Sequence, residues 1–237
     1  MQSKFFSRIV LGIVMLLSAG VVLAQRERLN FDGGWKFHLG NAADPKEDFN
    51  YGVGNILAKT GDADHTAIRM DFDDKAWTDV QLPHDWAVAL PFAQAANEDV
   101  QAHGYHAVGG LFPANSIGWY RKTFTMNRSD SGRRFVLQFD GIFRDSKVWI
   151  NDCYLGGHFS GYSGSAYDIT DFLHYGGKNT VVVRVDASQY EGWFYEGAVI
   201  YRHALLIVSD DLDLALGGGV FVHSVVGSGS AVVTIDS

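Results

Sequence analysis

The chain has 237 residues, of which 47% are hydrophobic and 19% are charged, and its formal net charge is -8. This composition supports a packed core and excludes a globally disordered chain. Basic residues gather no more densely than in pairs such as Arg121-Lys122, which argues against a nucleic-acid-binding surface because phosphate recognition needs clustered Lys and Arg. Cys153 is the one cysteine, so an intrachain disulfide and a Cys-rich zinc site are both excluded.

Residues 1–24 have the pattern of a secretory signal peptide. Two basic residues precede an apolar run over residues 9–17, and Val22 and Ala24 occupy the −3 and −1 positions of a cleavage site before Gln25. The apolar run is short for a helix that spans a bilayer, although an uncleaved anchor is the alternative. We therefore predict an exported, periplasmic or extracellular protein with no membrane segment after cleavage.

The chain beyond residue 25 reads as short strands. Apolar residues alternate with polar ones or form brief runs, and no long stretch has the 3.6-residue period of a helix. Strands are predicted, in chain order, at residues 119–124, 134–139, 147–150, 154–155, 166–169, 180–185 and 201–208, with a single helical turn at 171–173. Strands this short, separated by Gly, Asn and Asp turns, indicate an all-β sandwich or jelly roll.

Two stretches interrupt this pattern. Residues 41–74 are rich in Asp, Ala, Gly and Asn and are predicted to leave the sheet as an irregular excursion, either a surface decoration or a segment near a ligand. Residues 209–219 contain three Asp and three consecutive Gly, and two more strands are predicted at 220–223 and 231–235. Because two strands cannot bury a core, we predict a signal peptide over 1–24, a β-sandwich over 25–209 and the start of a truncated second domain over 210–237.

The candidate binding residues lie between two predicted strands. The segment is acidic, aromatic and flanked by glycine, and its members are Glu191, Trp193, Phe194, Tyr195 and Glu196. Aromatic rings stack on the faces of pyranose sugars, and carboxylates accept hydrogen bonds from sugar hydroxyls. We predict substrate binding here. The alternatives are rings that pack on the rim of the sandwich and, with less support because loops lack rigid backing, catalysis by the two glutamates.

Other candidate motifs favour structure over chemistry. No nucleophile elbow, phosphate-binding loop or zinc-protease motif is present, so no catalytic residue, cofactor or metal is predicted. His84 and Asp85 are neighbours on a strand, where side chains point to opposite faces, and a structural corner is favoured over proton chemistry. His103 and His106 have the spacing of a metal-ligand pair but no further ligands beside them, so a solvated loop is favoured.

Several strings in order resemble a known family. They are Gly118–Phe124, Phe139–Ile142 with Val148–Asn151, Gly161–Ser163 with Tyr167–Thr170, Glu191–His203 and Leu82–Trp86. Over residues 28–209 they resemble the N-terminal sugar-binding domain of family 2 glycoside hydrolases, the β-galactosidase and β-glucuronidase group. Val199 is a departure, because members of that family usually have Gly there; the turn before Ile200 is altered, or this copy is degenerate.

The resemblance implies both a fold and a function. It implies a jelly-roll-like β-sandwich of the galactose-binding type, followed by an immunoglobulin-like sandwich that begins near Asp211 and is cut short. It also implies that both catalytic glutamates lie on a barrel outside this chain. We expect the non-catalytic, sugar-binding portion of an exported retaining β-glycosidase of the β-galactosidase type, with a β-linked glycoside and the missing C-terminal domains as partners. A free-standing carbohydrate-binding module and a ligand-free structural sandwich are the alternatives.

Overall fold

The computed structural model describes residues 26–51, 66–93, 105–189, 197–210 and 221–236. One compact unit extends from Glu27 to Asp211, and the C-terminal strands belong to a second unit. Within the described ranges the only helices are 3-10 turns, η1 (Ala87–Ala89), η2 (Pro113–Asn115), η3 (Arg128–Asp130) and η4 (Thr170–Phe172). The described residues form no helix long and apolar enough to cross a membrane.

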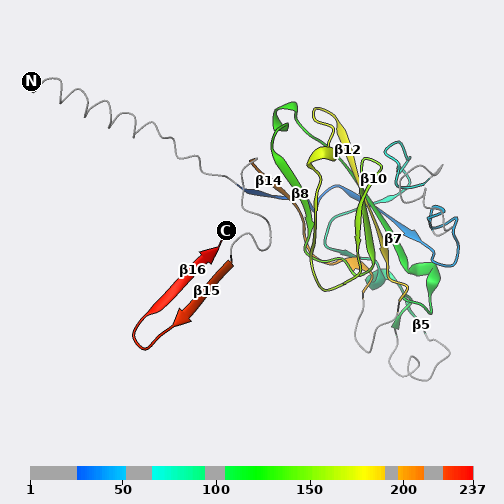
Figure 1. Ribbon diagram of the computed structural model, residues 1–237. Coiled ribbons are helices and arrows are strands. Elements are labelled where there is room, and N and C mark those ends of the chain that lie inside the picture. Colours follow the sequence, from blue (N-terminus) through cyan, green and yellow to red (C-terminus); the bar gives the residue numbers. More distant parts are fainter. Residues whose placement is uncertain (1–25, 52–65, 94–104, 190–196, 211–220, 237) are drawn as a thin grey trace, which may run out of the picture. The chain divides into compact units, whose positions relative to one another are not determined.

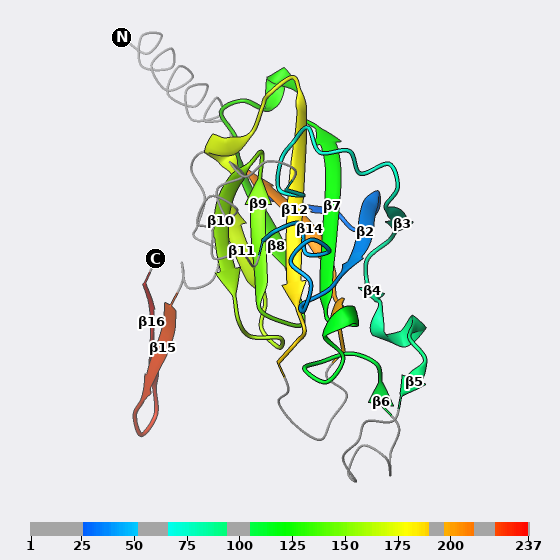
Figure 2. The same ribbon diagram turned by 90° about the vertical axis from the view of Figure 1, so that its right-hand side faces the viewer.

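The compact unit is a sandwich of two antiparallel sheets (Figures 1 and 2). The smaller sheet has the order β1 (Glu27–Asn30), β14 (Ala204–Ser209), β8 (Arg134–Phe139) and β11 (Ser165–Asp168). The larger sheet has the order β10 (Cys153–His158), β9 (Ser146–Ile150), β12 (Lys178–Asp186), β7 (Ile117–Thr125), β2 (Trp35–Gly40) and β3 (Thr78–Val80). The all-β sandwich predicted from the sequence is therefore confirmed.

Alternation along the strands builds the main core between the sheets. On β12, Val181, Val183 and Val185 are buried in this core, whereas Val182 and Arg184 between them point to the outer face. β8 follows the same rule, with Phe135, Leu137 and Phe139 buried and the residues between them half-buried. The two-residue period places the β-branched and aromatic side chains on one side, which favours strands over helices.

A second core covers the outer face of the six-stranded sheet. Its buried members come from the sheet and from the irregular stretch that follows β2, and they are Ala67, Ile68, Trp77, Ile117, Trp119, Trp149 and Val182, with Phe49, Tyr51 and Phe72 partly buried against them. Without this cover two tryptophans of the sheet would face water, at a cost set by their large apolar area. The described parts of 41–74 are thus a structural cover and not a surface decoration.

The corner between β1 and β14 is held by the carboxylate of Asp32. It accepts hydrogen bonds from the side chains of Asn30 (2.8 Å) and His203 (2.7 Å) and from the backbone amide of Ala204 (2.8 Å). Burial alone would raise the pKa of Asp32, but these hydrogen bonds outweigh it and hold the pKa below its usual value. The strand predicted at 201–208 is observed from Ala204, beside this corner, and the carbonyl of His203 accepts from the amide of Asp140 (3.0 Å) at the next position of the same register.

The second unit contains a hairpin of β15 (Phe221–Val226) and β16 (Ala231–Asp236), paired in register from Phe221 with Asp236 to Val226 with Ala231. All of its described residues are exposed, including five valines. The two strands predicted here are confirmed, and the hairpin has no core of its own, as expected of two strands. The immunoglobulin-like domain and the boundaries at 24 and 209 remain predictions.

Candidate functional site

Loops from both sheets meet at one end of the sandwich. β8, β10 and β12 end here at Phe139, His158 and Asp186, and β7, β9 and β11 begin here, as the lower part of Figure 2 shows. We call this the loop end. The five predicted sugar-binding residues, Glu191, Trp193, Phe194, Tyr195 and Glu196, belong to the connection between β12 and β13 and lie outside the described residues.

The described residues on both sides of that connection are firmly anchored. Before it, the carboxylate of Asp186 accepts from the backbone amide (3.0 Å) and the hydroxyl (2.5 Å) of Ser188. After it, Gly197 has a positive φ of 70°, a conformation that glycine adopts without strain. The amide of Trp86 then donates to the carbonyl of Ala198 (3.2 Å). The connection therefore starts and ends on fixed backbone.

A short strand between two neighbours gives the loop end its rigidity. β13 (Val199–Ile200) pairs with β4 (His84–Asp85) on one side. On its other side, Val199 exchanges two backbone hydrogen bonds with Phe143 (2.8 and 3.0 Å). The Val199 side chain is buried at 4% exposure, so valine fits this extended position and the departure from the family's usual glycine does not break the turn. We call β4, β13 and Phe143 the β13 framework.

His84 and Asp85 hold this framework through different partners. The imidazole Nδ1 of His84 lies 2.9 Å from the hydroxyl of Tyr120, and the carboxylate of Asp85 accepts from the amide of Ala87 (2.9 Å). Burial lowers the pKa of His84, although Asp85 acts in the opposite sense, so the ring is held neutral near pH 7. The structural corner predicted for this motif agrees with these contacts.

The second histidine motif yields no metal site in the described residues. His103 lies outside them, and His106 belongs to β6 (Tyr105–His106), which pairs with β5 (Phe92–Ala93). In the described part of the chain, groups of three or more His, Cys, Asp or Glu that could hold a metal ion do not occur.

Three glycines of the sequence strings allow rings to pack closely around the loop end. A Cβ atom at Gly118 would come within 2.5 Å of the Trp86 ring, and one at Gly141 within 2.5 Å of the Tyr201 ring. A Cβ atom at Gly161 would come within 2.0 Å of the Phe143 ring. These glycines are needed because side chains distant in sequence occupy the space that a methyl group would take.

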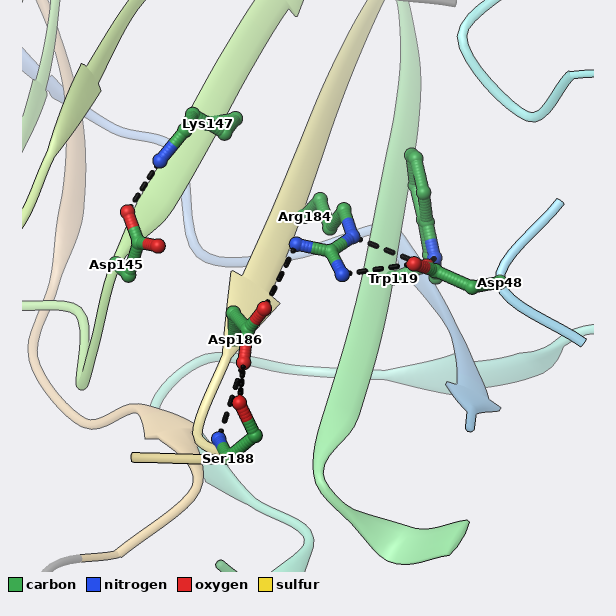
Figure 3. A network of polar contacts seen from close by, with 7 residues as sticks. All are labelled: Asp48, Trp119, Asp145, Lys147, Arg184, Asp186 and Ser188. Carbon is green, nitrogen blue, oxygen red and sulfur yellow. Dashed lines mark hydrogen bonds and ion pairs between the residues drawn. The ribbon is translucent and has the colours of Figure 1, made fainter. Parts of the chain in front are cut away.

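The outer face next to the loop end has a buried charge network that sequence reasoning missed (Figure 3). Arg184 donates to both carboxylate oxygens of Asp48 (3.0 and 2.7 Å) and to Asp186 (3.2 Å). The Trp119 indole donates to Asp48 as well (2.8 Å). Burial disfavours the Arg184 cation, but Asp48 more than compensates and the pKa of Arg184 is raised. No sequence signal could link Asp48 to a partner 136 positions away.

Comparison with known proteins shows which family this chain is similar to. A family model described as the sugar-binding domain of family 2 glycosyl hydrolases matches residues 29–209. A beta-galactosidase of Bacteroides ovatus is 34% identical over 206 residues, which cover 86% of this chain and 21% of that protein. A beta-glucuronidase of Bacteroides fragilis is 32% identical over 165 residues, 65% of this chain and 22% of that protein. The chain thus spans about a fifth of the length of these curated relatives.

Solved structures agree with this comparison. The crystal structure of a beta-glycosidase from Bacteroides vulgatus is similar with a TM-score of 0.63 and 29% identity, over 89% of this chain and 24% of that one. A family 2 glycosyl hydrolase from Bacteroides cellulosilyticus gives a TM-score of 0.62 and 27% identity, over 88% of this chain and 24% of that one. Both similarities extend over most of the chain.

Proposed function

Since this chain belongs to the family of glycosyl hydrolase family 2 sugar-binding domains, we propose that it serves as the sugar-binding portion of an exported retaining β-glycosidase of the β-galactosidase type. The extent of the family match carries the proposal, because residues 29–209 fill nearly all of the compact unit Glu27–Asp211. Retaining hydrolysis needs an acid/base carboxyl and a nucleophilic carboxylate. We assign both to parts of the enzyme outside this chain.

Recognition of the sugar is assigned to the connection between β12 and β13. The rings of Trp193, Phe194 and Tyr195 would cover the apolar face of a pyranose, and Glu191 and Glu196 would accept hydrogen bonds from its hydroxyls. Support comes from the anchoring of both flanks, by the Asp186–Ser188 contacts before the connection and by the β13 framework after it, since a binding site held on fixed backbone loses less entropy when it takes up a ligand.

We assign a neutral β-galactoside as the substrate class. Residues 190–196 contain two glutamates and no Lys or Arg. Like charges repel, so this segment would disfavour the carboxylate of a glucuronide. The Bacteroides ovatus relative, which covers 86% of this chain, also carries the name beta-galactosidase.

A binding titration tests the assignment. Methyl β-D-galactopyranoside is titrated into the purified chain by calorimetry, with methyl β-D-glucuronide as the charged comparison. Trp193→Ala is expected to weaken galactoside binding about tenfold, the loss of one stacking contact. The matched control is Phe172→Ala, which removes a 38% exposed ring from η4, between the far ends of β11 and β12, and should leave the affinity unchanged.

Three other results would each overturn part of the proposal. Equal affinity for Trp193→Ala and the unchanged chain would remove the loop from the site. A chain that binds neither sugar would be a structural sandwich. Hydrolysis of a chromogenic β-galactoside by this chain, lost on Glu196→Gln, would place the catalytic carboxylates here and contradict the assignment of catalysis to other domains.

A further inference from the structure

A second group of aromatic and polar side chains lies on the outer face of the larger sheet, beyond the residues that make up the β13 framework. It occupies the outer face of the six-stranded sheet at its β9–β10 edge, and its members are Tyr51, Asp145, Lys147, Tyr154 and Phe159. We call it the outer-face cluster. Figure 3 shows two of its members, Lys147 and Asp145, beside the strand that carries Arg184.

Phe159 gives the cluster an exposed ring in a fixed position. Its side chain is 72% exposed, so most of the ring is accessible to a ligand. The ammonium of Lys147 lies 4.9 Å from the centre of the ring, and the carbonyl of Phe159 accepts from the amide of Asp145 (3.5 Å). A ring that one cation holds in place while most of it faces water can stack on a ligand with little loss of entropy.

Polar groups converge next to this ring. Lys147 and Asp145 form a close ion pair, and their side chains are only 15% and 18% exposed. A Cβ atom at Gly157 would lie 2.8 Å from the Lys147 side chain and 3.0 Å from the Tyr154 hydroxyl. Glycine at this position of β10 therefore lets the two side chains approach each other over the strand.

Two phenols complete the cluster. Tyr154 is 40% exposed and packs on Trp149. Burial raises the pKa of Tyr154, and burial raises the pKa of Tyr51 to about 12. Both phenols are therefore protonated at neutral pH and able to donate. In the part of the chain that the structure describes, no hydrogen bond engages either hydroxyl.

We propose that the outer-face cluster is a second carbohydrate-binding site, which takes a neutral pyranose ring stacked on Phe159 with its hydroxyls bonded to Tyr154 and the Lys147–Asp145 pair. An exposed ring beside a few fixed polar groups is the composition by which proteins hold sugars. The charges favour a neutral sugar over a uronate: Lys147 is matched by Asp145, and Arg184 by Asp48 and Asp186. Among the described residues of the cluster and its neighbour Arg184, each cation is therefore already paired with a carboxylate.

The outer-face site and the site proposed on the β12–β13 connection are made of different residues, and amide-resolved NMR tests them separately. Methyl β-D-galactopyranoside is titrated into the isotope-labelled 237-residue chain. Saturable shifts are expected at the amides of Lys147, Tyr154 and Gly157, besides those expected at Val199 and Ile200. Phe159→Ala should weaken binding at the first group roughly tenfold, about 1.4 kcal/mol, and leave the second unchanged.

The remaining variants keep the two proposals distinguishable. Trp193→Ala should weaken the binding reported by the shifts at Val199 and Ile200 about tenfold, without altering the shifts at Lys147. Tyr154→Phe keeps the ring, removes the hydroxyl and should weaken the outer-face site roughly threefold. Phe172→Ala is the control for loss of an exposed ring and should change neither site.

Each pattern of shifts has a definite meaning. Shifts at Val199 and Ile200 alone would overturn the outer-face site and leave the proposed function standing. Shifts at Lys147 and Tyr154 alone would do the reverse. Outer-face shifts that grow linearly without saturation would show weak surface contact only, and saturable outer-face shifts whose affinity is unchanged in Phe159→Ala would show that the ring takes no part; either result would overturn the second site.

Discussion

The buried ion pair between Arg184 and Asp48 provides the sharpest test of how the outer face is held together. Their side chains are 6% and 4% exposed. Asp48→Asn keeps the shape of the side chain but removes the negative charge. The Arg184 cation then stays buried without the ion pair that offsets the free-energy cost of its burial. Breaking one partner of a buried pair costs about 3 to 5 kcal/mol. We expect the lower half of that range, because Asp186 still contacts Arg184 at 3.2 Å and the Tyr51 ring lies 4.4 Å from it.

The assay is equilibrium urea denaturation at pH 7, followed by tryptophan fluorescence. With an m-value of about 2 kcal/mol per M, a loss of about 3 kcal/mol lowers the urea midpoint by roughly 1.5 M. That loss is a large share of the 5 to 15 kcal/mol that usually stabilises a domain, as an order of magnitude. The matched control is Asp79→Asn, because Asp79 also faces a cation, Lys36 at 3.2 Å, but is 88% exposed. Its midpoint should barely move, since exposed pairs contribute little.

Two results would refute this reasoning. A midpoint for Asp48→Asn within error of the Asp79→Asn midpoint would mean that the pair adds nothing net to stability. A loss of stability that high salt reproduces in the unchanged protein would mean that the pair is screened like a surface pair. Either result would mean that the ion pair does not add to the apolar contacts that hold the irregular segment on the sheet.

The other predictions concern the β1–β14 corner, the loop end and export. The pKa of Asp32 is lowered in the folded state. The ionised carboxylate therefore stabilises the fold above the unfolded pKa of about 3.9, and this stabilisation is lost as the pH falls through the folded pKa. In thermal melts from pH 7 to 2, the difference in stability between the unchanged chain and Asp32→Asn should close only below about pH 4; a difference that stays constant would contradict this. Gly161→Ala forces a methyl group against the Phe143 ring and should lower the free energy of unfolding, measured with urea, by about 1 to 3 kcal/mol. The control Gly33→Ala, where nothing lies within 4 Å of the added atom, should lower it much less, and equal losses of stability in the two variants would refute the packing argument. N-terminal sequencing of protein exported from a bacterial host should begin at Gln25, and a chain that retains residue 1 would contradict cleavage.

Strands with a strong two-residue pattern were predictable from the sequence. β8 begins and ends where it was predicted, and β7, β9 and β12 each include the whole of the predicted range. Strands of a half-buried sheet alternate apolar and polar residues, and this alternation can be read within each segment of the sequence. β1 and β2 were not assigned, since Glu27–Asn30 is mostly exposed, and the residues between the buried Trp35 and Gly40 are half-buried on both faces. The alternation of apolar and polar residues that marks a strand is missing where neither face of the strand is fully buried.

The residue types of the candidate site could be predicted from the sequence, but the backbone contacts that anchor its flanks could not. The acidic and aromatic residues between Glu191 and Glu196 can be read directly from the chain. The pairing of Val199 with Asp85 and Phe143 joins segments separated by more than 50 positions, and no local pattern records such contacts. Phe159 likewise stands in a loop without periodicity, and only the fold shows that its ring is exposed beside Lys147.

The sequence by itself determined the all-β class and the family, and it supplied the residues that we propose to bind a sugar, because strand periodicity and short strings are local properties of the chain. Only the tertiary structure decided what lies against what: that residues 41–51 and 66–74 cover a sheet face, that Asp48 neutralises Arg184, and that glycines at 118, 141 and 161 make room for distant rings. Those facts depend on contacts between segments far apart in the chain, and such contacts exist only once the sheets have packed.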